Sequence, residues 1–219
     1  PLDLARAHAG AEHLVLLYAA TTDSDGRQRS LLALAPQNEP TAADGWLGTR
    51  FGYLGYEAFD TDNSIAPAVI DFPSQWLSYF GCVYVFHHDR KQLECWGEPP
   101  APQPAESTAS PVVAALQSTM SRAEYLEHVA ATIDKIHAGE FYQANITRKF
   151  HGCFEAAPEP FELYEKLCAS NPAPYSAFIK MGKRAILSSS PECFLRVDAA
   201  GNAQSHPIKG TARKTGDAK

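Results

Sequence analysis

The sequence lacks the features that mark several large classes of protein. Its five cysteines form no C-x-x-C pair, so neither a disulfide framework nor a cysteine-rich zinc site is indicated. The longest apolar run, from Leu14 to Ala20, is far shorter than the ~20 residues that a membrane-spanning helix needs. No basic-then-apolar segment suggests a secretory signal. We therefore expect reduced thiols, a cytoplasmic location and no membrane partner.

An excess of positive charge is missing as well. The chain has 19 Lys and Arg against 25 Asp and Glu, a formal net charge of −6, which argues against a nucleic-acid partner. The sequence contains no phosphate-binding loop motif and no motif typical of a Ser-His-Asp catalytic triad. The histidines have no metal-ligand spacing, so we assign solvated or structural roles to them, including the His87, His88 and Asp89 cluster.

The sequence does contain enough apolar residues, 45% of 219, for one large or two small domains. Prolines crowd between Gly97 and Pro111 without any apolar period, which is typical of a linker. We therefore predict a β-rich region over residues 1–97, a Pro-rich linker over 98–117 and a further region over 118–219.

Apolar runs bounded by turn residues predict strands on both sides of the linker. They cover His13 to Tyr18, Arg29 to Ala35, Phe51 to Tyr56 and Cys82 to His88, and later residues 175–180, 184–190 and 192–197. A capping box at Ser121 and Glu124 begins a helix that Gly139 ends, and a second helix is expected over residues 160–169. Residues 140–150 alternate apolar and polar side chains and predict one more strand.

Lys209, in the stretch S-H-P-I-K-G-T-A-R-K, is the first candidate for chemistry. An ordinary lysine is neutral in only about one molecule in 2,500 at pH 7, so a nucleophilic lysine needs a lowered pKa. The cations His206, Arg213 and Lys214 close by in sequence would act in that direction. The alternative is an exposed loop lysine.

Glu192 is the second candidate. It follows S-S-S-P, which predicts a place in the first turn after a strand, with Ser190 as the cap and Pro191 as the opening residue. A carboxylate at this position usually only stabilises the helix through its interaction with the helix dipole. Glu192 becomes a candidate general acid only if it faces the same cavity as Lys209. We interpret the neighbouring Cys193 as a buried, inert thiol.

Four motifs, G-E-F-Y-Q-A-N-I-T-R-K-F, N-P-A-P-Y-S-A-F, A-I-L-S-S-S-P-E-C-F and P-I-K-G-T, occur in this order. In their order and separations they resemble the chorismate-utilising enzymes, and within that family the aminodeoxychorismate synthase component I branch. The resemblance implies an α+β fold of antiparallel sheets packed as an orthogonal sandwich with flanking helices, like anthranilate synthase component I. It also implies that this chain is the N-terminal portion of such an enzyme, with 118–219 the incomplete first part of the chorismate-binding domain.

The same resemblance implies roles for single residues. Lys209 would attack C2 of chorismate, Glu192 would protonate the departing C4 hydroxyl, and Gly210 and Thr211 would lie against the substrate. Anthranilate synthases carry alanine in place of Lys209. Relatives that form isochorismate or salicylate place a lysine base at the position of Gln143, and a glutamine cannot take a proton.

The resemblance further implies a tryptophan pocket and a set of partners. The pocket residues would be Pro174, Tyr175, Ser176, Tyr142 and Asn145, with the Asp23 to Arg29 turn as the opposite wall. Ala19 stands where the family has a serine. Mg²⁺ is expected as a cofactor, and none of its ligands is expected within this sequence. A glutamine amidotransferase subunit is expected to supply the ammonia. The alternatives are an anthranilate synthase component I and a non-catalytic tryptophan-binding module.

Overall fold

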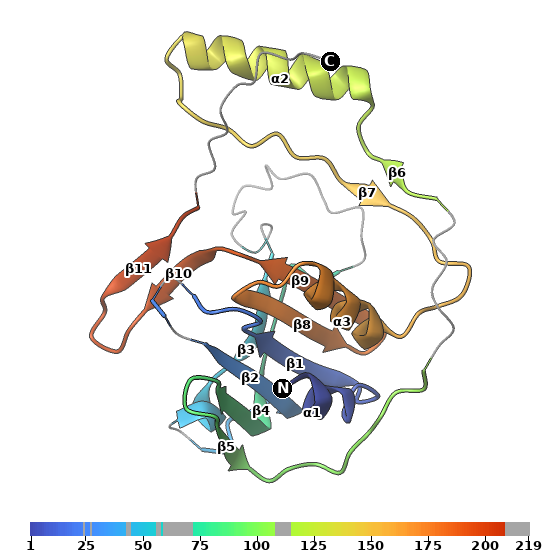
Figure 1. Ribbon diagram of the computed structural model, residues 1–219, viewed down its shortest axis with the longest axis vertical. Helices are drawn as coiled ribbons and strands as arrows, with labels where there is room; N and C mark the ends of the chain where they lie inside the picture. The colour runs from blue at the N-terminus through green and yellow to red at the C-terminus, as the bar shows by residue number, and fades with distance from the viewer. Residues whose placement is uncertain are drawn as a thin grey trace. The chain divides into compact units, whose positions relative to one another are not determined.

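The computed structural model describes residues 1–23, 25–26, 28–42, 45–55, 58, 72–107 and 115–208 (Figure 1). They form two compact units, one made of residues 1–107 and 159–219 and the other of residues 108–158. Both helices and antiparallel strands are present, which confirms the predicted α+β class. None of the helices in these ranges is long and apolar enough to cross a membrane.

The first unit is built on a seven-stranded antiparallel sheet. Its strands run in the order β3-β4-β2-β1-β8-β9, and β5 pairs with β4. Their bounds are β1 (His13–Tyr18), β2 (Arg29–Gln37), β3 (Phe51–Leu54), β4 (Gln75–His87), β5 (Gln92–Gly97), β8 (Tyr175–Met181) and β9 (Arg184–Ser190). Because β1 pairs with β8, with Val15 opposite Ile179, the Pro-rich segment separates these strands in sequence but not in the sheet.

The central strands β1, β2 and β4 are buried on both faces of this sheet, which explains why they contain nearly continuous apolar runs. Leu14 and Leu16 of β1 point to one face, where α1 (Leu2–Arg6) and α3 (Pro160–Ser170) pack, while Val15 points to the other. On the first face Phe178 packs against α3. On the second, the short 3-10 helix η1 (Gly45–Gly48) brings Trp46 near Phe51.

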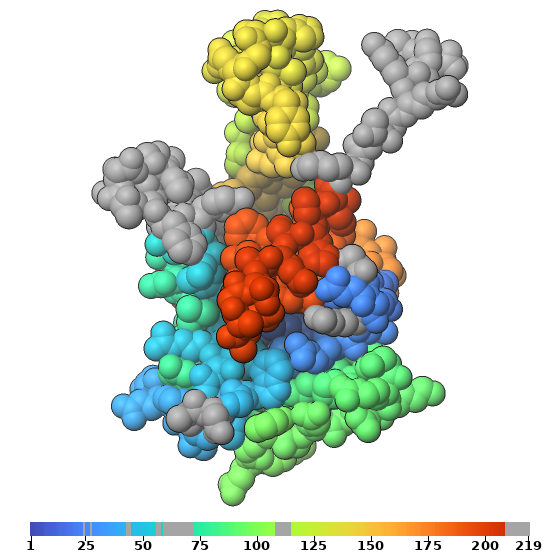
Figure 2. Space-filling model, turned by 90° about the vertical axis from the view of Figure 1, so that its left-hand side faces the viewer, coloured from blue at the N-terminus to red at the C-terminus, as the bar shows by residue number. Residues whose placement is uncertain are grey.

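A hairpin of β10 (Cys193–Val197) and β11 (Ala203–His206) forms a separate two-stranded sheet in the first unit. Asp198 closes its turn by accepting hydrogen bonds from the backbone of Ala200 and from Asn202. Figure 2 shows this hairpin, in red, on the face turned to the viewer, beside the N-terminal residues in blue.

The second unit contains β6 (Gln117–Ser118), α2 (Arg122–His137) and β7 (Phe150–His151). The predicted capping box begins α2: the Ser121 hydroxyl accepts from the backbone of Glu124, whose carboxylate accepts from the backbone of Ser121. The predicted strand over residues 140–150 is wrong except at Phe150, because β6 offers β7 a partner only two residues long. Alternation of side chains specifies a face of a strand, but a strand also needs a neighbour.

Candidate functional site

The sequence places three of its candidates, Lys209, Gly210 and Thr211, just beyond the last described residue, Ile208. Their predicted roles therefore lie outside the described residues. Glu192 is described, so the site is built from Glu192, the hairpin that follows it and the pocket beside that hairpin.

Glu192 is exposed and lies in the short connection between β9 and β10. The Ser190 hydroxyl accepts a hydrogen bond from the Glu192 backbone N–H (3.3 Å) and donates one to the Glu192 carbonyl (3.2 Å). Ser190 thus caps a tight turn between two strands, and no helix begins here. The connection fixes the backbone of Glu192, whose side chain is exposed.

The root of the hairpin brings Glu192 next to the segment that leads to Lys209. Cys193, the residue after Glu192, pairs with His206 across β10 and β11. Pro207 and Ile208 follow His206 and end the described part of the chain. Cys193 is buried, as expected, and its thiol lies beside the Tyr175 hydroxyl. Two segments that the sequence separates therefore leave the same end of one hairpin.

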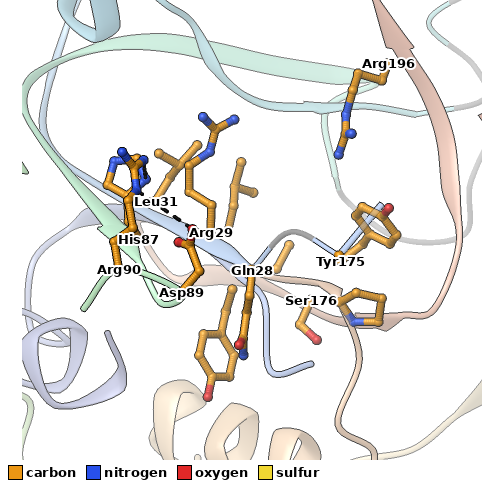
Figure 3. Close-up of a pocket in the computed structure, with 14 residues that line it drawn as sticks. Gln28, Arg29, Leu31, His87, Asp89, Arg90, Tyr175, Ser176 and Arg196 are labelled. Atoms are coloured by element: carbon orange, nitrogen blue, oxygen red, sulfur yellow. Dashed lines mark hydrogen bonds and ion pairs between the residues drawn. The ribbon is translucent and has the colours of Figure 1, made fainter. Parts of the chain in front are cut away.

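A pocket of about 550 Å³ lies at one end of the seven-stranded sheet (Figure 3). Because β1 runs antiparallel to both β2 and β8, the end of β1 lies between the starts of those two strands. The wall includes Pro174, Tyr175 and Ser176 together with Gly26 and residues 28–29. The structure thus brings together the two segments that the resemblance named as opposite walls. The volume suits a small organic ligand.

Hydrogen bonds organise the floor of this pocket. The Gln28 amide donates to the carbonyls of Ala19 (3.0 Å) and Ala20 (3.3 Å), which holds the start of β2 to the end of β1. The buried Ser176 hydroxyl donates to the Ala173 carbonyl (3.3 Å). Ala19, where the resemblance implies a serine, is buried.

Tyr175 is the polar group of the pocket with the clearest capacity for a ligand. Its buried hydroxyl has no nitrogen or oxygen hydrogen-bond partner among the described residues. Burial raises the pKa of Tyr175, and the nearby Asp23 carboxylate raises it further. The phenol therefore stays protonated at neutral pH and can either donate or accept a hydrogen bond.

Arg196 of β10 spans from the hairpin to the turn that forms the pocket wall. Its guanidinium donates to Asp25 Oδ2 (2.9 Å) through Nη1 and to Asp23 Oδ2 (3.1 Å) through Nη2. His206 adds a longer contact, 3.9 Å from Nε2 to Asp25 Oδ1. In Figure 3, Arg196, Tyr175 and Ser176 lie on one side of Gln28.

The other side of the pocket carries His87, Asp89 and Arg90 (Figure 3). Arg90 Nη2 lies 2.8 Å from His87 Nδ1, and His87 Nε2 lies 2.9 Å from Glu94 Oε1. Because a guanidinium can only donate, Nδ1 accepts and Nε2 donates in this arrangement. These contacts fit the structural alternative of the solvated or structural role assigned to His87, and no sequence pattern indicated that His87 lines a pocket.

Two predicted pocket residues belong to the other unit. Tyr142 and Asn145 lie in residues 108–158, both are exposed, and neither is in a strand. Their role in binding stays a prediction. The structure adds Tyr18 and Arg196 to the pocket wall, which the sequence analysis missed. For Arg196 a signal existed, since a lone arginine interrupts the apolar strand C-F-L-R-V.

No group of three or more His, Cys, Asp or Glu side chains within the described ranges could hold a metal ion. Asp23 and Asp25, the carboxylates beside the pocket, are both engaged by Arg196. All five cysteines are free thiols. The expected Mg²⁺ therefore stays a prediction.

The chain is similar in sequence to curated enzymes of two related activities. It is 30% identical to aminodeoxychorismate synthase component 1 of Klebsiella aerogenes over 196 residues, covering 84% of this chain and 42% of that protein. It is 32% identical to anthranilate synthase component 1 of Aeropyrum pernix over 130 residues, 59% of this chain and 29% of that protein. The chain thus spans less than half the length of these relatives.

Its structure resembles that of anthranilate synthase component I from Streptococcus pneumoniae, with a TM-score of 0.58 over 86% of this chain and 52% of that one. The identity in this comparison is 18%, so it shows a shared fold. A family model described as chorismate binding enzyme matches residues 6–219. On these grounds, together with the ordered motifs, the chain belongs to the chorismate binding enzyme family.

Proposed function

We propose that the complete polypeptide containing these residues aminates chorismate at C4, giving 4-amino-4-deoxychorismate for p-aminobenzoate and folate biosynthesis. Support comes from the family match and from Lys209, since the resemblance implies that anthranilate-forming relatives carry alanine at that position. The similarity to aminodeoxychorismate synthase component 1 extends over most of this chain and agrees with the proposal.

The reaction would proceed by two displacements. The neutral amine of Lys209 attacks C2 of the ring, the double bond shifts, and the C4 hydroxyl leaves as water with a proton from Glu192. Ammonia then attacks C4, the double bond shifts back and the lysine leaves. The balance is chorismate plus ammonia giving 4-amino-4-deoxychorismate plus water.

One structural observation carries the proposal: the pairing of Cys193 with His206 at the root of the hairpin. It sets Glu192 and the segment entering Lys209 at the same end of two neighbouring strands. A nucleophile that acts at C2 and a proton donor that acts at C4 of the same ring need such an arrangement. Without it, Glu192 would be an ordinary exposed carboxylate.

Further components belong to the same proposal. Ammonia would come from a glutamine amidotransferase subunit. Mg²⁺ would be held by residues other than those that the structure describes, and no step above depends on it. The sheet would be completed as an orthogonal sandwich, which the exposed apolar side chains of Leu77 and Leu93 on β4 and β5 support.

A second function is favoured by the pocket itself. Its volume of about 550 Å³ and the side chains of Tyr18 and Tyr175 in its wall suit an aromatic amino acid, and we propose tryptophan as the ligand. Calorimetric titration with tryptophan tests this, with Tyr175→Ala expected to weaken binding. In a protein that binds tryptophan but leaves chorismate unchanged, the non-catalytic module would be the correct alternative.

The activity is tested with the complete polypeptide, chorismate, magnesium and ammonium, with products separated by chromatography and identified by mass. The 4-amino product is expected, and 2-amino product would indicate an anthranilate synthase. Without ammonium, an adduct with the mass of chorismate less water should accumulate on Lys209.

Two variants complete the test. Lys209→Ala and Lys209→Arg should both lose the adduct and the product, because neither residue offers a neutral amine. Lys183→Ala, at an exposed lysine in the turn between β8 and β9, is the matched control and should keep both. A Lys209→Ala enzyme that aminates C4 at close to the parent rate would exclude the covalent mechanism.

A further inference from the structure

The orientation of the β10–β11 hairpin relative to the seven-stranded sheet must be fixed by contacts other than strand pairing. Among the described residues, its strands pair only with each other and not with the seven-stranded sheet. Its root is fixed by the buried Cys193, directly after Glu192. A two-stranded ribbon held only at its root can swing about that root.

Arg196 provides a second point of attachment. Strands rise about 3.3 Å per residue, so Arg196 lies about 10 Å along the hairpin from Cys193. There its guanidinium contacts both Asp23 and Asp25, at 3.1 and 2.9 Å. A contact about 10 Å from the root restrains rotation of the hairpin about its root more effectively than the root alone does.

This attachment differs from an ordinary surface ion pair. The side chain of Asp23 is only 7% exposed, and those of Arg196 and Asp25 are 31% and 28% exposed. Partly buried, charge-assisted hydrogen bonds from one planar guanidinium to two carboxylates have defined directions. Loss of the arginine would leave the Asp23 carboxylate in a poorly solvated place without this cation.

We propose that Arg196 is a positioning residue that holds the hairpin to the Asp23–Asp25 turn and thereby sets the direction in which Glu192 approaches the substrate. This rests on the proposed function of Glu192 as a proton donor. Arg196 itself need not touch chorismate. Its effect passes along β10 from the Asp23–Asp25 turn to the hairpin root.

The attachment can be tested without catalysis. Alkylation of Cys193 by iodoacetamide, followed by peptide mass spectrometry on the complete polypeptide, measures how often the root opens. Cys168, buried in α3, is the internal reference. Arg196→Met should raise the ratio of Cys193 to Cys168 labelling by about tenfold or more, the change expected for losing about 1.4 kcal/mol of closure. An unchanged ratio would overturn the proposal even if the enzyme proves active.

The effect on catalysis is tested with a double-mutant cycle. Arg196→Met should lower kcat for chorismate by about 10- to 100-fold, within the range that a general acid contributes, with little change in KM. In an enzyme already carrying Glu192→Gln, the same change should cost less than about threefold, because the group that it positions is gone. Equal losses in both backgrounds would show that Arg196 does not act through Glu192.

A third variant separates positioning from stability. Combining Arg196→Met with Asp23→Asn and Asp25→Asn removes the two carboxylates that have lost the arginine and should restore the free energy of unfolding without restoring the attachment. We expect kcat to stay low in this variant, and recovery of kcat would overturn the proposal. If the parent enzyme makes no 4-amino product, the proposed function fails, while the labelling ratio still decides whether Arg196 holds the hairpin.

Discussion

Replacing Phe178 by leucine should destabilise the first unit by about 1–3 kcal/mol. The side chain of Phe178 is fully buried in β8, and its ring centroid lies 5.1 Å from that of Phe161 and 5.4 Å from that of Tyr164. Leucine keeps most of the apolar volume but loses both ring pairs, and each such pair contributes about 0.5–1.5 kcal/mol beyond its buried area. The loss is therefore large against a total stability of about 5–15 kcal/mol.

Urea unfolding followed by tryptophan fluorescence is a suitable assay, because Trp46, Trp76 and Trp96 all lie in the first unit. With a denaturant slope of about 2 kcal/mol per molar urea, the midpoint should fall by about 0.5–1.5 M. Residues 108–158 contain no tryptophan, so the unfolding of the second unit does not contribute to the signal.

Phe194→Leu is the matched control, since the Phe194 side chain is 89% exposed in β10. A surface change of this kind should shift the free energy of unfolding by less than about 0.5 kcal/mol. Equal shifts for the two variants would refute the packing of α3 on β8. A fall in midpoint for Phe178→Leu alone would support it.

Two further predictions concern the backbone and pH. Gly97→Ala should cost more than about 2 kcal/mol, because φ is +82° and a Cβ would lie 2.0 Å from the Gly81 carbonyl oxygen. Gly201→Ala, with φ of +83° and open space, should cost only about 1–2 kcal/mol, and equal unfolding midpoints would contradict the close approach of β4 and β5. Burial lowers the pKa of His8, so its contribution to stability is present above about pH 6.5 and declines as pH falls below that value. Urea midpoints at pH 7.5 and 5.5 should differ less in His8→Gln than in the parent, and an equal difference would exclude His8 as a source of the pH dependence.

The sequence by itself determined the elements whose signals are local. Helix α2 begins at the predicted capping box, because a hydroxyl and a carboxylate three residues apart satisfy each other's backbone N–H groups. Strand β1 matches the predicted His13 to Tyr18, because an apolar run between turns predicts a buried strand. The resemblance to a known family also implied that the segment at Pro174 and the turn after Asp23 form two walls of one pocket, and the structure brings these segments together.

The tertiary structure alone decided which strands pair and which side chains meet. Residues 140–150 alternate like a strand, yet only Phe150 is in one, since no sequence pattern reports whether a neighbouring strand is available. The pairing of Val15 with Ile179, and the contact of Arg196 with Asp23 and Asp25, join residues more than 150 positions apart. Such contacts depend on how the whole sheet folds, because the chain entropy that opposes them is compensated only when many distant segments come together at once.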